Sequence, residues 1–205
     1  EDGKSVENAG LLKKAMKYAS MFNLPVFSHC EDMSLVGGGV MNAGEMAQRI
    51  GMKGISADSE EVIVARDIIL ARSTGVKLHI CHISTEGSVQ LIREAKLRGE
   101  KVTAEVCPHH FSLTDEAVEG YDANTKMNPP LRAKKDVESI KKALKDNIIE
   151  IIATDHAPHH IDEKNCEYDK AAFGIVGLET ALALGITHLV EEDIISPLEL
   201  IEKMS

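Results

Sequence analysis

The chain has 205 residues, of which 43% are hydrophobic, enough for the core of one large domain. Charged residues make up 27% and the net charge is -10, which argues against a basic nucleic-acid-binding surface. No apolar run reaches the roughly 18 residues of a membrane span, and the first residues do not resemble a signal peptide. We therefore expect a cytoplasmic protein that binds neither nucleic acid nor membrane.

Short apolar segments alternate with longer amphipathic ones along the chain. The predicted elements, in chain order, are a helix over 5–22 with Ser5 as N-cap, a strand over 24–30, a helix over 58–75, a strand over 76–83, a helix over 84–100, a strand over 101–107, a loop over 125–135, a helix over 133–147, a strand over 148–154 and a long polar loop over 156–177. This order predicts right-handed crossovers and a parallel sheet, either a doubly wound open sheet or a (β/α)8 barrel. Neither a GxGxxG nor a P-loop motif is present, so a nucleotide-binding open sheet loses support.

Polar groups follow three of the predicted strands. His29, His82 and Asp155 stand at or just past the ends of their apolar runs. Because the carboxyl ends of parallel strands share one face of such a fold, the three side chains are predicted to lie at one rim. A single strand-end histidine is more often structural, but three matching placements favour a site. Imidazole and carboxylate are the ligand types of Zn²⁺ and similar divalent ions.

Other histidines are given structural roles at this point. His79 lies three positions before His82, so strand alternation predicts that it points to the opposite face, towards the covering helices. His109 and His110 follow a proline at the rim, where they could be ligands, groups behind the ligands or part of a substrate loop; we do not count them as ligands. The four cysteines form no CxxC pair and are expected to be reduced and mostly buried.

Six motifs, in chain order, resemble those of the bacterial type of dihydroorotase in the amidohydrolase superfamily: "SHCED", "HICHIST", "VTAEVCPHHFSLT", "KMNPPLR", "ATDHAPH" and "FGIVGLET". The resemblance extends over essentially the whole chain. It implies a metal-bearing (β/α)8 barrel that interconverts dihydroorotate and N-carbamoyl-L-aspartate in pyrimidine synthesis. Allantoinase and dihydropyrimidinase have similar motifs and remain alternatives, as does a non-catalytic barrel of the same family kept for assembly.

The resemblance also implies residue roles. It implies ligands for one or two Zn²⁺ ions, which are Asp2, His29, His82 and Asp155. Asp2 matches the acidic residue that bridges two metals, and Asp155 matches the ligand that also acts as general base and acid. The implied substrate contacts are Asn128, His159, Phe173 and Gly174.

One family motif is missing. The His-x-His-x-Arg at the end of the first barrel strand, which holds the first metal and the substrate carboxylate, does not occur in the chain. A closed barrel also needs eight strands and about 250 residues. We therefore expect residues 1–205 to form one partial barrel domain, the C-terminal part without the first strands and the final segment. Such a chain should have little or no activity alone and should tend to self-associate. The resemblance leaves a homodimer or a complex with aspartate transcarbamoylase open.

Overall fold

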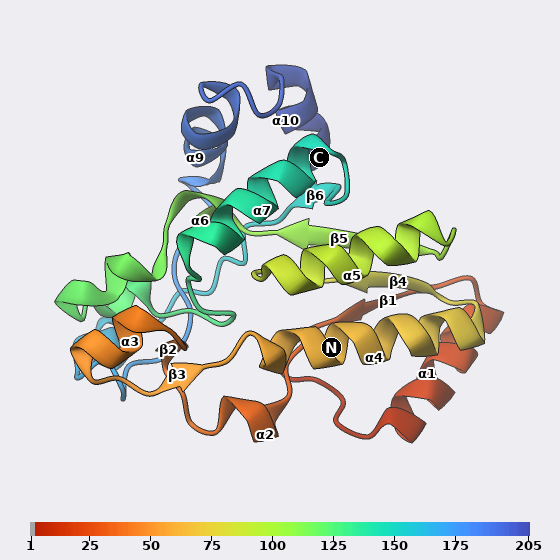
Figure 1. The fold of residues 1–205 in the computed structure, drawn as a ribbon, viewed down its shortest axis with the longest axis horizontal. Helices are drawn as coiled ribbons and strands as arrows, with labels where there is room; N and C mark the ends of the chain where they lie inside the picture. Colours follow the sequence, from red (N-terminus) through yellow and green to blue (C-terminus); the bar gives the residue numbers. More distant parts are fainter. Residues whose placement is uncertain (1–2) are drawn as a thin grey trace.

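The computed structural model describes residues 3–205, and a four-stranded parallel sheet in the order β1-β4-β5-β6 lies at its centre (Figure 1). Its strands are β1 Pro25–Ser28, β4 Lys77–Ile80, β5 Val102–Val106 and β6 Ile151–Ile152. A second parallel pair joins β2 Met41–Asn42 to β3 Gly54–Ile55. This small pair was not predicted, since strands of two residues leave no periodic pattern in the sequence.

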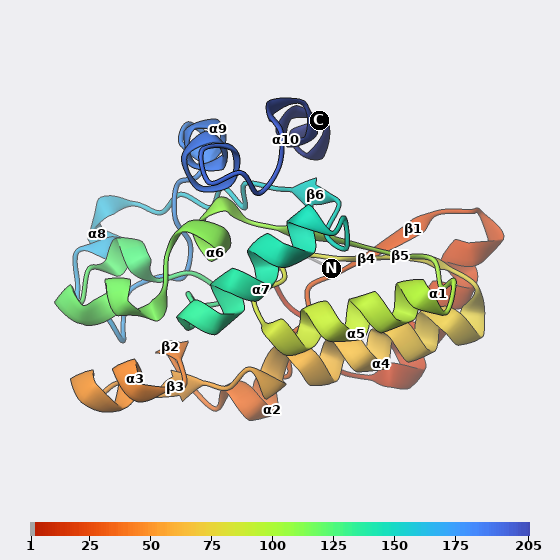
Figure 2. The same ribbon diagram turned by 45° about the horizontal axis from the view of Figure 1, so that its top comes forward.

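Helices α4, α5 and α7 form one layer against one face of the sheet, and α9 and α10 lie beyond β6 (Figures 1 and 2). The α-helices are α1 Ala9–Met21, α2 Met33–Val36, α3 Glu45–Ile50, α4 Asp58–Thr74, α5 Glu86–Leu97, α6 Pro108–Ser112, α7 Lys134–Lys145, α8 Ile161–Lys164, α9 Ala181–Gly185 and α10 Pro197–Met204. The 3₁₀ helices η1 and η2 span Asp115–Gly120 and Ala123–Thr125, and the π-helix η3 spans Ile186–Val190. No helix in the described part of the chain is both long and apolar enough to cross a membrane.

The predicted helix boundaries follow from local signals. α4 has three acidic residues in its first turn and ends before Gly75, which takes a left-handed φ of 73°. α1 departs from the prediction, because it begins at Ala9 and its cap is Asn8, which accepts a hydrogen bond from the Leu11 amide at 2.9 Å. Ser5 is not the cap: its hydroxyl donates to the carbonyl of His29 and ties the start of the chain to the end of β1.

The two faces of the central sheet have different surroundings. Leu78 and Ile80 of β4 are buried in one hydrophobic cluster with side chains from α4, α5 and α7. His79, between them, therefore lies on the opposite face, which these helices do not cover. The prediction that His79 points towards the helices is wrong. Its ring nitrogens lie 2.8 Å from Thr103 Oγ1 and 3.0 Å from Glu105 Oε2, both on β5.

The sheet is part of a barrel, as predicted. Among the described residues β1 pairs only with β4 and β6 only with β5, so each outer strand has one open edge. Phe27 projects from β1 on the face opposite to the helices and is 50% exposed, where the interior of a closed barrel would bury it. Four strands of the eight that a closed barrel needs are present in this sheet.

The helix-covered face should dominate stability. Replacing Ile80, which is fully buried, by Ala removes packed methylene groups, and we expect a loss of about 2–5 kcal/mol in the free energy of unfolding. The matched control is Ile69→Ala on α4, where the side chain is 54% exposed and the loss should stay below about 0.5 kcal/mol. Denaturant unfolding followed by circular dichroism measures both, and similar losses would contradict this assignment of the core.

Candidate active site at the strand ends

A cavity of about 590 Å³ lies at the carboxyl ends of the central strands. Six of the eight predicted site residues line it: His29, His82, Asn128, Asp155, Phe173 and Gly174. His29 directly follows β1, His82 comes two residues after β4, and Asp155 three residues after β6. The structure therefore brings residues from three separate strands to one cavity, as the strand-end pattern predicted. Their individual roles stay predictions.

Of the other two predicted residues, Asp2 lies outside the described residues. His159 is described but is not among the residues that line this cavity. Its Nε2 donates to the carbonyl of Phe173 at 2.8 Å, because that oxygen can only accept. A Cβ atom on Gly174, which has a φ of 131°, would lie 2.8 Å from His159 Nε2. His159 therefore supports the Phe173–Gly174 segment, and this close approach requires glycine at 174.

A close contact at the site joins the two predicted histidine ligands. His29 Nδ1 and His82 Nε2 lie 2.8 Å apart, and His29 is only 3% exposed. Burial, and then the neighbouring His29, lower the pKa of His82, so its ring is neutral at neutral pH. Two nitrogen ligands of one tetrahedral ion lie about 3.3 Å apart. The two ring nitrogens would therefore have to move only slightly apart to bind one cation between them.

Glu31 is a site residue that sequence analysis missed. Its Oε1 accepts from Asn128 Nδ2 at 3.0 Å, and its Oε2 lies 3.4 Å from His29 Nε2. Burial raises the pKa of Glu31, but the hydrogen bonds with His29 and Asn128 outweigh it and hold that pKa below its usual value. Carboxylates that orient a ligating imidazole through its second nitrogen are common at metal sites. The available signal was its place two residues after His29 in "SHCED".

Asp155 shares the cavity with the histidines but belongs to neither of the tightest donor groups. Within the described residues, two sets of three donor atoms lie within 4.8 Å of one another: His79, Cys81 and Glu105, and Cys107, His109 and His110. The first set borders the same cavity through Cys81 and Glu105. Burial, and then the charge of Glu105, raise the pKa of Cys81 to about 12, so the thiol is protonated at neutral pH.

Comparison with known proteins agrees with this geometry. Residues 1–88 match the family model described as dihydro-orotase-like. The chain is 57% identical over 205 residues to the dihydroorotase of Pelotomaculum thermopropionicum and equally to that of Ruminiclostridium cellulolyticum, and both alignments cover all of this chain and 48% of the relative. The chain is thus similar to dihydroorotases over its whole length. It spans about half the length of the curated relatives it matches.

Solved structures support the fold of this chain. The L-hydantoinase (dihydropyrimidinase) of Arthrobacter aurescens matches 98% of this chain and 47% of its own with a TM-score of 0.86 and 23% identity. The dihydropyrimidinase of Brevibacillus agri NCHU1002 matches 95% and 44% with a TM-score of 0.82 and 22% identity. At this identity the likeness concerns the fold alone. This likeness in fold indicates that the chain forms part of an α/β barrel.

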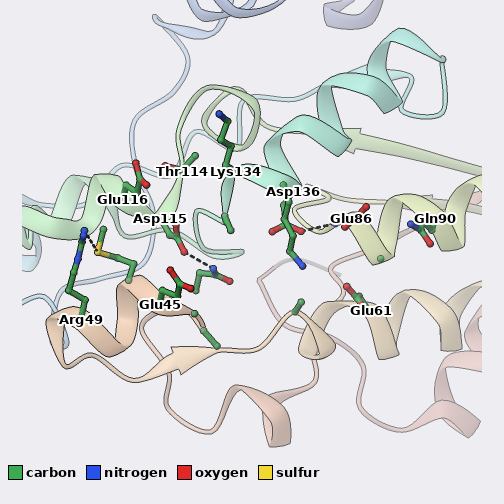
Figure 3. A pocket seen from close by; sticks show the side chains of 18 residues that line it. Glu45, Arg49, Glu61, Glu86, Gln90, Thr114, Asp115, Glu116, Lys134 and Asp136 are labelled. Carbon is green, nitrogen blue, oxygen red and sulfur yellow. Dashed lines mark hydrogen bonds between the residues drawn. The ribbon is translucent and has the colours of Figure 1, made fainter.

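A larger cavity, of about 720 Å³, lies elsewhere, and none of the predicted site residues lines it. Figure 3 shows Glu61, Glu86 and Gln90 on one side of it and Glu45, Asp115 and Glu116 on the other. Two of its carboxylates have partners in the protein: Asp115 accepts from Asn42 Nδ2 at 2.7 Å, and Asp136 from the Glu86 amide at 3.0 Å. It contains no histidine or cysteine, so the smaller cavity is the better candidate site.

The negative charge of Glu61 in the larger cavity should slightly lower the free energy of unfolding. Burial raises the pKa of Glu61 above its ordinary value, so stability falls as the pH rises from that ordinary value through the raised one. We expect Glu61→Gln to stabilise the protein at pH 7 by up to about 1 kcal/mol, and the gain to vanish near pH 4. Urea unfolding at both pH values measures this.

Glu116→Gln is the control for Glu61→Gln, because this exposed residue lines the same cavity. It should show no such dependence on pH. An equal gain from both variants would mean that the overall negative charge, and not burial of Glu61, is responsible.

Proposed function

We propose that residues 1–205, as one partial barrel domain, carry the catalytic half-site of a metal-dependent cyclic amide hydrolase. Its substrate pair is dihydroorotate and N-carbamoyl-L-aspartate, interconverted in pyrimidine synthesis. The observation that carries the proposal is the shared cavity of His29, His82, Asp155 and Asn128. Relatives named dihydroorotase, 52–57% identical over the chain, support the choice of substrate.

His29, His82 and Asp155 would hold the metal, with Zn²⁺ the ion we propose, and Asp2 would bridge to a second one. A bound divalent ion would supply Lewis-acid activation of the amide carbonyl. The residues suit this role chemically, since neutral imidazole and carboxylate bind such ions without first losing a proton at neutral pH. Glu31 would hold the His29 ring through Nε2 and so direct Nδ1 towards the cavity.

The remaining steps fall to side chains of the cavity. The Asp155 carboxylate takes a proton from the attacking water and delivers it to the leaving amide nitrogen. Asn128 and the Phe173–Gly174 segment hold the substrate against the histidines, and fixed orientation of this kind lowers the entropic part of the barrier. His159 acts on this segment through the Phe173 carbonyl.

Sister hydrolases acting on allantoin or dihydropyrimidines are the nearest alternative. The structural neighbours named hydantoinase or dihydropyrimidinase are 20–25% identical, far below the relatives named dihydroorotase. A non-catalytic barrel used for assembly is the alternative from another class, and such a barrel has no need for the His29–His82 contact. We further propose a cytoplasmic location. We also propose assembly as a homodimer or with aspartate transcarbamoylase, and light scattering of the whole protein tests this assembly.

The function is best tested in a chimaera in which residues 1–205 replace the matching segment of the Pelotomaculum thermopropionicum relative. We expect turnover of dihydroorotate in preference to allantoin and dihydrouracil. Asp155→Asn should lower kcat by about 10²- to 10⁴-fold, because the amide cannot accept the proton. Asp162→Asn, in an exposed position of α8, should leave kcat unchanged.

Preference for another cyclic amide would replace the substrate assignment. A folded, metal-loaded chimaera without any turnover would support the non-catalytic alternative. Equal kcat values for the Asp155→Asn and Asp162→Asn proteins would remove Asp155 from the proton transfer.

The 205-residue chain alone should be nearly inactive, because the open face of the sheet leaves the site half enclosed and no His-x-His-x-Arg is present. The same assay under the conditions of the chimaera measures this, and turnover within tenfold of the chimaera would contradict it. Its exposed apolar face should also make the chain self-associate in analytical ultracentrifugation.

A further inference from the structure

The end of β5 carries a buried cluster of donor groups that the proposed reaction does not use. Cys107 directly follows β5, and His109 and His110 lie in the first turn of α6. All three are buried, at 0%, 4% and 2% exposure, and none of them lines the cavity of His29 and His82. The Cys107 Sγ and one ring nitrogen of each histidine lie within 4.8 Å of one another.

The hydrogen-bonding state of His110 leaves one nitrogen free to bind a ligand. Its Nε2 lies 3.0 Å from the carbonyl of Pro129, which can only accept, so Nε2 carries the proton. Nδ1 is then an unprotonated lone pair, and it has no hydrogen-bond partner in the described part of the chain. An imidazole that donates one N–H to a carbonyl and offers its other nitrogen has the usual arrangement of a metal ligand.

His109 and Cys107 complete the set. His109 Nε2 is also buried without a hydrogen-bond partner among the described residues. Burial lowers the pKa of His109 well below its ordinary value and that of His110 to about 3, so both rings are neutral at neutral pH. Unsatisfied buried polar atoms each cost about 1–3 kcal/mol, so two side by side need an explanation.

We propose that Cys107, His109 and His110 bind a cation of their own, Zn²⁺ or a similar thiophilic ion. One sulfur and two imidazole nitrogens match the ligand types of such ions. Donor atoms around a tetrahedral zinc lie about 3.3–3.6 Å apart, so the three groups would draw together by up to roughly 1 Å on binding. His109 also borders a cavity of about 130 Å³ between α6 and α9, which offers a path of entry and room for a water as fourth ligand.

Binding at this site has a distinct proton balance. Burial raises the pKa of the Cys107 thiol well above its ordinary value, so the ion must displace its proton, while the neutral rings lose none. One proton is therefore released per cation. The proposal does not depend on the function proposed above.

Cobalt titration of the metal-free 205-residue chain tests the proposal, since Co²⁺ occupies zinc sites and absorbs in the near ultraviolet when a thiolate binds it. We expect one thiolate band per chain, release of about one proton per ion in calorimetry in buffers of different ionisation enthalpy, and loss of the band in Cys107→Ser. Cys166→Ser, an exposed cysteine, and Asp155→Asn should keep the band. Zn²⁺ should displace the cobalt.

The Cys81→Ser variant separates this site from the other donor group. A band that survives Cys107→Ser and disappears in Cys81→Ser would overturn the proposal, as would the absence of any band. Because Cys107→Ser can disturb folding, X-ray absorption of the zinc-loaded unmodified chain is the second measurement. One sulfur neighbour with nitrogen neighbours is expected at the high-affinity ion, and a shell of oxygen and nitrogen only would also overturn the proposal.

Discussion

The arrangement of the site depends on one buried cation, the guanidinium of Arg132. The side chain is 3% exposed and donates to Ser84 Oγ at 3.0 Å, to Asn42 Oδ1 at 3.1 Å and to the carbonyl of Ile55 at 2.9 Å. Glu60, also buried, lies 3.9 Å from Nη2 and offsets the charge. Removing one partner of such a buried pair costs about 3–5 kcal/mol, which makes the connection hard to break. One residue of the "KMNPPLR" segment thus ties the end of β4 to β2, β3 and α4.

This connection explains how a segment without regular structure can hold a site residue in place. Arg132 fixes the end of the segment, and the His110 side chain holds the carbonyl of Pro129. Asn128 directly precedes Pro129 and lines the cavity. Its side chain donates to Glu31, which lies beside His29. The amide of Asn128 is therefore positioned by its own bond to Glu31 and by the contacts of Pro129 and Arg132, which follow it in the chain. Loops that carry functional groups are commonly held by a rigid scaffold in this way.

Sequence patterns predicted the long elements and the strand-end residues because both follow from periodicity and from the shared direction of parallel strands. They could not predict the β2–β3 pair, whose strands are too short to show a period. Nor could they predict Glu31, whose importance depends on a contact with Asn128, 97 positions away. Ser5 has the chemistry of a helix cap, but a tertiary contact with His29 takes its hydroxyl, and Asn8 caps the helix instead.

The error over His79 has a physical cause that also bears on the site. Alternation along β4 would place His82 on the same side as Ile80, facing the helices, yet it lines the cavity. The strand ends at Ile80, and His82 takes a left-handed φ of 35°, which turns its ring away from the side that alternation assigns. Asp155 has the same feature, with a φ of 47°. This conformation costs about 1–2 kcal/mol for an L-residue, less for Asp and His than for branched side chains. Strained backbone of this kind persists only where surrounding contacts hold it, and here it occurs at two of the three strand-end residues that form the candidate metal site.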